Sequence, residues 1–349
     1  MRMAAGGLGP GLVLLTLGAV GLGGCFGEDA SGAASALQLA SCTIPGIDRP
    51  TECGTLMVPE NRERPTRTIA LNLVVVRAAA GKEREAVFFM TGGPGTAATA
   101  AARPLTNEHA ALAGSHDFVF MDQRGTGQSA PLACPERTTP TLAPMFSAAD
   151  AALCRKSLEP AADLLAYTTS DAAADLEALR RALGYGPINL HGSSYGTRLA
   201  WAYAAQYPAQ ARTMTLHGPV PPGFLIPLAF PRGLETGLNG VIEDCLADEA
   251  CGKRFPGLKA DVDLAFERLR SRPAPVTLEG ETESSITRGE LAEAVRYLLY
   301  SAMDARRLPL LLTQAAAGDY NPIARALATY RRGLMRSVNN RHVPGGDVR

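Results

Sequence analysis

A serine between two glycines stands at residues 192–196, in the stretch Gly192-Ser193-Ser194-Tyr195-Gly196. A serine hydroxyl attacks a carbonyl group when a neighbouring base takes its proton and nearby donors stabilise the oxyanion that forms. The pattern G-x-S-x-G suits this chemistry, because glycines on both sides allow a tight turn from a strand into a helix. We therefore predict that Ser194 is a nucleophile and that the backbone amide of Tyr195 binds the oxyanion.

A second glycine-rich stretch, Thr91 to Gly95, follows an apolar run at residues 86–90. Glycines allow a backbone to approach a substrate closely, so Gly93 is predicted to supply a second oxyanion donor. A tight turn without chemistry is the alternative for this stretch taken alone. A third stretch, Asp122 to Ser129, follows the next apolar run, and its Asp122 and Arg124 are expected to brace loops rather than to react.

The segments around these motifs alternate between extended and helical patterns. Strands are predicted at 69–77, 86–90, 117–122, 188–192 and 213–218, and helices at 170–184 and 195–208. This alternation predicts an α/β fold, with a mostly parallel sheet and helices on both of its faces. After Pro219 the patterns are mainly helical, with one strand near Val276. We expect a core at 41–220, a helical cap at 221–335 and a tail at 336–349.

Taken in their order, the motifs resemble those of the proline iminopeptidase and tripeptidyl aminopeptidase branch of the α/β-hydrolases. The shared stretches are GGPG at 92–95, DQRGTGQS at 122–129, YTT at 167–169, GSSYG at 192–196, CGTLMVP at 53–59, and a cysteine pattern that ends in FP at 255–256. The resemblance implies an exported serine peptidase that releases short peptides or single residues from free N-termini. Carboxylates of the cap are expected to bind the substrate's α-ammonium group, and the candidates are Glu235, Glu243 and Asp244.

The base and the acid that would accompany Ser194 are not evident. The resemblance implies that both follow the cap, as an acidic turn and then a late histidine. After residue 336, the only histidine is His342 and the only carboxylate side chain is Asp347, on a Gly-Pro-rich tail that matches no triad pattern. We therefore expect the hydrolase to be impaired by absence of the C-terminal Asp and His. The alternatives are a non-catalytic peptide-binding surface lipoprotein, and an esterase with an unconventional base such as His342.

The other histidines near these motifs are expected to have structural roles. His191 lies three residues before Ser194 on the same predicted strand, so its ring is expected to face packing rather than the hydroxyl. His109 and His116 precede the strand at 117–122 and are expected at the surface.

The first residues carry the pattern of an export signal. Arg2 precedes an apolar run at 8–22, and Leu22-Gly23-Gly24-Cys25 resembles a bacterial lipobox. Residues 1–24 are therefore expected to be a signal peptide, and Cys25 a lipid attachment site that anchors the protein in the bacterial cell envelope. An ordinary secretory signal is the alternative. Residues 25–40 are expected to form a flexible tether.

Six further cysteines favour disulfides in an exported chain. Several pairings are compatible with the sequence, and pairing of neighbours along the chain predicts Cys42–Cys53, Cys134–Cys154 and Cys245–Cys251. No CxxC or HxxxH spacing occurs, so neither a metal nor another cofactor is expected. Lys and Arg together number 34, as do Asp and Glu, which gives no basic excess for binding nucleic acid.

Overall fold

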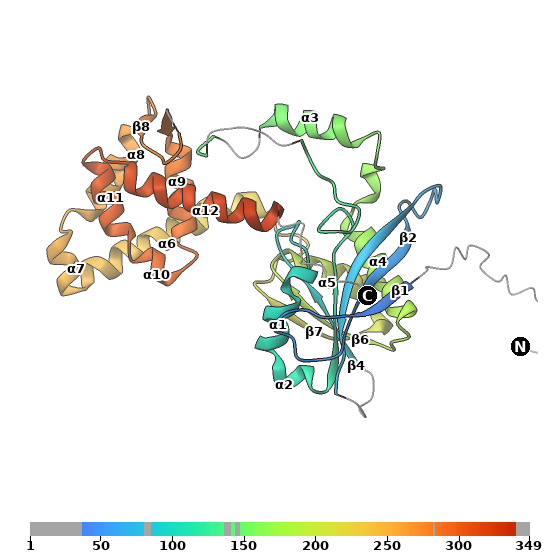
Figure 1. Ribbon diagram of the computed structural model, residues 1–349. Coiled ribbons are helices and arrows are strands. Elements are labelled where there is room, and N and C mark those ends of the chain that lie inside the picture. Colours follow the sequence, from blue (N-terminus) through green and yellow to red (C-terminus); the bar gives the residue numbers. More distant parts are fainter. Residues whose placement is uncertain (1–36, 80–84, 136–140, 144–146, 282, 340–349) are drawn as a thin grey trace, which may run out of the picture. The chain divides into compact units, whose positions relative to one another are not determined.

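The computed structural model describes residues 37–79, 85–135, 141–143, 147–281 and 283–339 (Figure 1). Its strands β1 to β7 form one sheet, in the order β1-β2-β3-β5-β4-β6-β7. The bounds are β1 (Leu37–Cys42), β2 (Thr51–Pro59), β3 (Thr68–Val76), β4 (Glu85–Met90), β5 (His116–Met121), β6 (Ile188–Ser193) and β7 (Ala211–His217). Pairing is antiparallel for β1–β2, β2–β3 and β3–β5, and parallel for the remaining neighbours. All strands except β1 and β3 therefore run in one direction, and the predicted mostly parallel sheet is confirmed.

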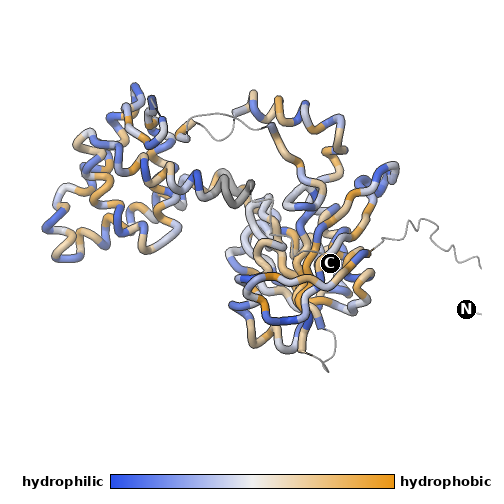
Figure 2. Tube along the Cα trace, in the orientation of Figure 1, coloured by the Kyte–Doolittle hydropathy of each residue, from blue (hydrophilic) through white to orange (hydrophobic). Residues whose placement is uncertain are grey.

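Helices cover both faces of this sheet, because successive strand residues alternate between two apolar clusters. On β4, Phe88 packs with buried residues of α4 and α5, whereas its neighbour Phe89 packs with the segment around α1. The elements that follow the strands are η1 (Thr99–Ala101), α1 (Ala102–Glu108), α2 (Ala110–Ala113), α3 (Ala148–Leu158), η2 (Leu164–Ala166), α4 (Thr169–Ala182), α5 (Tyr195–Gln206) and η3 (Pro208–Gln210). Apolar residues gather along the central strands (Figure 2).

The N-terminal edge of the sheet differs from the prediction. The tether expected to reach residue 40 ends earlier, because β1 begins at Leu37 and pairs with β2. Leu37 and Leu39 lie two residues apart and both pack against the sheet's core, which explains why this segment is extended rather than free. The predicted start of the tail, residue 336, also lies within a helix, since α12 continues to Asn339.

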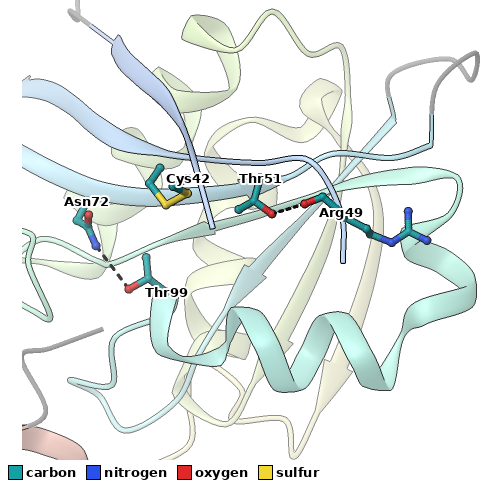
Figure 3. Close-up of a disulfide and its surroundings, with 6 residues drawn as sticks. Cys42, Arg49, Thr51, Asn72 and Thr99 are labelled. Atoms are coloured by element: carbon teal, nitrogen blue, oxygen red, sulfur yellow. Dashed lines mark hydrogen bonds between the residues drawn. A yellow bond between two sulfur atoms is a disulfide. The ribbon is translucent and has the colours of Figure 1, made fainter. Parts of the chain in front are cut away.

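Three disulfides join the pairs that were predicted from the sequence. Cys42–Cys53 links β1 to β2, with the two Cα atoms 5.7 Å apart (Figure 3). In the turn between these strands, the Thr51 hydroxyl donates a hydrogen bond to the Arg49 carbonyl oxygen at 3.0 Å. The other two bridges are Cys134–Cys154 and Cys245–Cys251, with Cα separations of 4.9 Å and 5.1 Å. Each bridge closes a short loop and restricts the unfolded chain.

The segments after residue 225 form a helical region with an apolar core of its own. Its elements are α6 (Ile226–Ala247), α7 (Glu249–Arg254), α8 (Leu258–Arg268), β8 (Ala274–Val276), β9 (Ser284–Ile286), α9 (Arg288–Leu298), α10 (Ala302–Ala305), α11 (Leu308–Ala316) and α12 (Asn321–Asn339). The strand expected near Val276 is β8, and it pairs with β9. The described helices include none that combines the length and the apolar run needed to cross a membrane.

A buried carboxylate ties α4 to α5 beside the sheet. Glu177 accepts hydrogen bonds from Arg180 Nε at 2.8 Å, Arg181 Nε at 2.7 Å and the Tyr203 hydroxyl at 3.0 Å. Burial raises the pKa of Glu177, but these donors outweigh burial and lower it to about 2. The folded state therefore holds this carboxylate in its charged form.

Replacing Glu177 with Gln should make the unfolding free energy less dependent on pH. Because the folded pKa of Glu177 is depressed, its contribution is complete above the unfolded value near 4.5 and is lost as pH falls toward about 2. The shift corresponds to roughly 3 kcal/mol. Urea unfolding at pH 6 and pH 3 should show the gap between wild type and Glu177→Gln shrinking at pH 3. A gap of equal size at both pH values would contradict this role.

Candidate active site

Ser194 occupies the turn between β6, which ends at Ser193, and α5, which begins at Tyr195. Its backbone has φ 53° and ψ −120°, in a region that residues with a side chain rarely adopt. Such a conformation costs on the order of 1–3 kcal/mol and persists when the surroundings enforce it. Ser194 is exposed, whereas Ser193 is partly buried at the strand end. The turn is thus the strained strand-to-helix junction that presents a serine hydroxyl to solvent.

The glycines of the motif are required by contacts between backbones. A Cβ atom added to Gly196 would lie 2.1 Å from the Met90 carbonyl oxygen, at the end of the neighbouring strand β4. A Cβ atom added to Gly192 would lie 2.7 Å from the Gly196 carbonyl oxygen. Both separations are far below contact distance, so each position excludes a larger residue. The first turn of α5 is therefore pressed against the ends of β4 and β6.

The glycine loop after β4 lies directly against the serine. A Cβ atom added to Gly92 would be 2.7 Å from Ser194 Cβ and 3.2 Å from Ser194 Oγ. Gly93 has φ 112° and is joined to Pro94 by a cis peptide bond. Among the described residues, the amides of Gly93 and Tyr195 have no hydrogen-bond partner. Tyr195 opens α5, and the first amides of a helix lack an internal acceptor, so these two amides are the candidate oxyanion donors.

Asp122 braces the loops around the serine, as the sequence suggested. This side chain is fully buried after β5, and its Oδ1 accepts bonds from the amide and the hydroxyl of Thr99, both at 2.9 Å. Its Oδ2 accepts from Asn72 Nδ2 at 3.1 Å and from the Gln128 amide at 3.1 Å. One carboxylate therefore fixes β3, the segment that follows the glycine loop, and its own loop.

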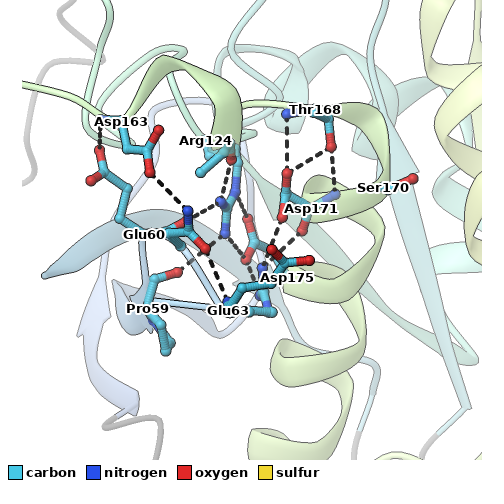
Figure 4. A network of polar contacts seen from close by, with 12 residues as sticks. Pro59, Glu60, Glu63, Arg124, Asp163, Thr168, Ser170, Asp171 and Asp175 are labelled. Carbon is cyan, nitrogen blue, oxygen red and sulfur yellow. Dashed lines mark hydrogen bonds and ion pairs between the residues drawn. The ribbon is translucent and has the colours of Figure 1, made fainter. Parts of the chain in front are cut away.

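Arg124 forms a second buried brace (Figure 4). Its Nε and Nη2 each donate to the Asp175 carboxylate of α4 at 2.7 Å, and both side chains are almost fully excluded from solvent. Its Nη1 donates to the carbonyl oxygens of Glu60 at 2.7 Å and Ala166 at 2.5 Å. Burial lowers the pKa of Arg124, but the bonds with Asp175 outweigh that effect and raise it. Arg124 is therefore a structural cation, consistent with the predicted role.

A cavity of about 230 Å³ opens beside the turn at residues 192–196, which we call the elbow. The lining residues are Pro94, Gly95, Gln123, Arg124, Gly125, Thr126, Leu132, Tyr167, Thr168, Ala172 and Tyr195. The hydroxyl of Tyr195 bonds to Thr169 Oγ1 at 2.7 Å, and that of Tyr167 donates to Glu60 at 2.8 Å. These bonds fix the two tyrosine rings in place along the cavity. All three glycine-containing motifs contribute to this cavity.

Two side chains of α5 that sequence reasoning missed connect the elbow to the segment that follows β7. Thr197 Oγ1 donates to the Ser194 carbonyl oxygen at 2.6 Å and accepts from the Val220 amide at 2.9 Å. Arg198 Nη2 donates to the carbonyl oxygens of Pro221 at 3.3 Å and Pro222 at 3.4 Å. These bonds hold the turn at Ser194 to the segment that follows β7. The bonds to Val220, Pro221 and Pro222 could not be predicted from local patterns, because these residues lie more than twenty positions away.

The described histidines do not contact the Ser194 hydroxyl. The centroid of the His191 ring lies 4.9 Å from that of Phe89 and 5.3 Å from that of His109, as expected for a structural residue. Burial, and to a smaller extent the charge of His109, lowers the pKa of His191. His109 and His116, which were expected at the surface, are partly exposed. His217, at the end of β7, accepts a bond from the Ser194 amide through its carbonyl oxygen at 2.9 Å.

The predicted cap carboxylates make no contact with the residues of this site within the described part of the chain. Glu235, Glu243 and Asp244 are exposed on α6, and none of them forms an ion pair within the described residues. His342 and Cys25 lie outside the residues that the structure describes. The same holds for residues 1–36, which include the predicted signal peptide and most of the tether.

The sequence matches the family model described as the alpha/beta hydrolase fold over residues 85–251. That match includes β4 to β7, the loops that follow β4 and β5, and the turn at Ser194, and the fold is that of the α/β-hydrolases. Within this class, the relatives support the branch of the tripeptidyl aminopeptidases and proline iminopeptidases.

Three curated relatives illustrate the likeness. Tripeptidyl aminopeptidase of Streptomyces lividans is 30% identical, over 50% of this chain and 36% of its own length. Serine protease Hip1 of Mycobacterium bovis is 27% identical, over 64% of this chain and 46% of its own length. Proline iminopeptidase of Neisseria meningitidis is 30% identical, over 38% of this chain and 32% of its own length. Each match thus spans less than half of the relative.

Replacing Gly196 with Ala should destabilise the protein, although Ala favours helices elsewhere. The new Cβ atom would overlap the Met90 carbonyl oxygen, and relieving that overlap should cost roughly 3 kcal/mol or more. Gly186→Ala is the matched control, because a Cβ atom there meets nothing within 4 Å. Thermal unfolding of both variants tests this expectation. Equal melting temperatures for the two variants would contradict the contact.

Proposed function

We propose that the chain is an exported serine hydrolase that acts on peptides, with Ser194 as its nucleophile. The observation that carries the proposal is the exposed, strained turn that holds Ser194 against the glycine loop. A conformation of this kind is maintained against its cost at sites that need a fixed geometry. The relatives named as peptidases support peptides as the substrate class.

The mechanism follows from the groups around the turn. Ser194 Oγ attacks the carbonyl carbon of the scissile bond and gives its proton to water, the carbonyl π bond opens, and negative charge develops on the carbonyl oxygen. The amides of Gly93 and Tyr195 donate hydrogen bonds to that oxygen, and the N-terminus of α5 adds the positive end of its dipole. One such donor is worth about 10²–10³ in rate. Because the loops are braced by Asp122 and Arg124, these donors need no rearrangement during the reaction. When this intermediate collapses, the carbon–nitrogen bond breaks and the amine leaves with a proton from water; a second water then hydrolyses the acyl ester.

The cavity beside the elbow is proposed to hold a side chain of the substrate. Pro94, Leu132, Tyr167 and Tyr195 give it largely apolar and aromatic walls. Gln123 also lines the cavity. Its side-chain amide makes no hydrogen bond within the described residues, so this group is free to bind a peptide group. A pocket with several apolar and aromatic walls and a few polar groups suits a neutral, bulky side chain.

The preference for free N-termini and the cellular location remain parts of the proposal. The names tripeptidyl aminopeptidase and proline iminopeptidase support release from an N-terminus. Glu235, Glu243 and Asp244 carry the charge that would attract an α-ammonium group. Three disulfides are compatible with export. Attachment of lipid at Cys25 would hold the protein at the membrane surface.

The described residues supply a nucleophile and oxyanion donors but no base in contact with the Ser194 hydroxyl. General-base assistance contributes about 10²–10⁴ to such reactions. We therefore propose that turnover by this chain is slow. The same observation favours a second candidate function, in which the site binds peptides without cleaving them.

Hydrolysis of an Ala-Ala-Phe reporter should be slow, should disappear in Ser194→Ala, and should persist in Ser193→Ala. The two serines are adjacent, so the second variant controls for changes at the turn that do not remove the nucleophile. Folding of each variant is checked by circular dichroism. A reporter with an acetylated N-terminus should be cleaved less than the free one, because it lacks the α-ammonium group.

Turnover that survives in Ser194→Ala would refute Ser194 as the nucleophile. Rapid turnover that Ser194→Ala removes would refute the absence of a base, and its loss in His217→Ala or His342→Ala would identify that base. Binding of the reporter without cleavage in wild type would favour the second function. Equal cleavage of the free and acetylated reporters would refute the N-terminal preference.

A further inference from the structure

In the helical region, a cluster of aromatic side chains lies around Arg296 of α9. The guanidinium carbon of Arg296 lies 4.2 Å from the ring centroid of Tyr297, 5.2 Å from that of Phe230 and 5.5 Å from that of Tyr300. Tyr297 in turn stacks on Tyr330 of α12, with ring centroids 3.6 Å apart. Residues of three helices and the turn after α9 therefore surround one cation.

This cluster faces solvent. Tyr300 is 63% exposed and Phe230 is 44% exposed, although aromatic rings usually contribute most when they are buried. Arg296, Tyr297 and Tyr330 are partly exposed beside them. Exposed rings grouped around a cation differ from the scattered single apolar residues found on most surfaces.

The charge of Arg296 is not neutralised within the described residues. Its Nη1 donates to the Tyr300 hydroxyl at 2.6 Å, and it has no carboxylate partner there. Glu293, one turn earlier in α9, is paired with Arg331, whose Nε donates to it at 3.0 Å. Asp304 of α10 is paired with Arg307 at 3.2 Å. The acidic groups nearest along the chain are therefore already engaged.

The arrangement leaves one edge of the guanidinium available. Nη1 is occupied by Tyr300, while Nε and Nη2 have no acceptor among the described residues. These two atoms present parallel N–H groups, which match the two oxygens of a carboxylate. The rings stacked near Arg296 restrict its rotamers, so less entropy is lost when a ligand binds. Arginine and tyrosine are also the residues that most often dominate binding energy at interfaces.

We propose that Arg296, together with Phe230, Tyr297 and Tyr300, binds the carboxylate of a peptide. The carboxylate accepts two hydrogen bonds from the free edge of the guanidinium, and an adjacent aromatic side chain packs on the exposed rings. None of these residues belongs to the cavity beside Ser194, and the site does not depend on the proposed hydrolase function. Its ligand class is an anionic peptide, with either a free C-terminus or an acidic side chain.

Isothermal titration calorimetry on the full chain carrying Ser194→Ala tests the site without turnover. The probes are acetyl-Ala-Ala-Phe with a free carboxylate, the same peptide as its amide, and acetyl-Ala-Glu-Phe amide. Acetylation removes the α-ammonium group, so the outcome is independent of any N-terminal preference. The free acid should bind at least about tenfold more tightly than its amide. Tighter binding of the Glu peptide than of the free acid would assign the site to acidic side chains.

Arg296→Gln should weaken binding of the acid by about tenfold, since it removes both the positive charge and the two parallel N–H donors of the guanidinium. Arg325→Gln is the matched control, because Arg325 is exposed on α12 and contacts no carboxylate or ring within the described residues. Arg296→Lys keeps the charge and should restore part of the affinity. Thermal unfolding of each variant separates lost binding from lost folding.

Three results would overturn the proposal. Equal affinity of the acid and the amide would remove the carboxylate from recognition, and this comparison needs no variant. Unchanged binding of the acid in a folded Arg296→Gln protein would move the site elsewhere. A phosphotyrosine peptide that binds more tightly than both carboxylate peptides would assign the cluster to phosphate instead.

Discussion

The candidate site depends on the close approach of three backbone segments at Ser194. Strands β4 and β6 are parallel neighbours, and Met90 pairs with Gly192 where both strands end. The loop after β4 and the elbow after β6 therefore leave the sheet at the same edge, as adjacent parallel strands require. The first turn of α5 packs so tightly against β4 that Gly196 has no room for a side chain. This packing forces Ser194 into its strained conformation and brings its hydroxyl to the glycine loop.

Buried charges hold the surrounding loops in place. Asp122 and the Arg124–Asp175 pair are excluded from solvent, and burying such groups is costly unless every polar atom is matched. Here the matching is extensive, since Arg124 also binds two backbone carbonyls. Removing one partner of a buried pair typically costs about 3–5 kcal/mol. We infer that these groups are kept because they fix loop geometry, which an apolar core would define less sharply.

Local patterns in the sequence predicted much of this architecture. Apolar runs located β3 to β7, the helical pattern at 170–184 located α4, and chain proximity gave all three disulfide pairs. The strand at Leu37 was missed because its short alternating pattern is weak beside the small and polar residues before it. The contacts of Thr197 with Val220 and of Arg198 with Pro221 were not predictable, since these partners are distant in sequence. Likewise, the exposed cluster around Arg296 arises only when three helices pack together.

A peptide boronic acid tests most directly the proposal that Ser194 is a nucleophile beside two oxyanion donors. Boron adds a serine oxygen to give a tetrahedral anion, which resembles the oxyanion intermediate and forms at equilibrium even where turnover is slow. Boron-11 nuclear magnetic resonance on the full chain should show the tetrahedral signal with wild type and with Ser193→Ala, but not with Ser194→Ala. A boron that stays trigonal with wild type, or a tetrahedral adduct that persists in Ser194→Ala, would contradict the account.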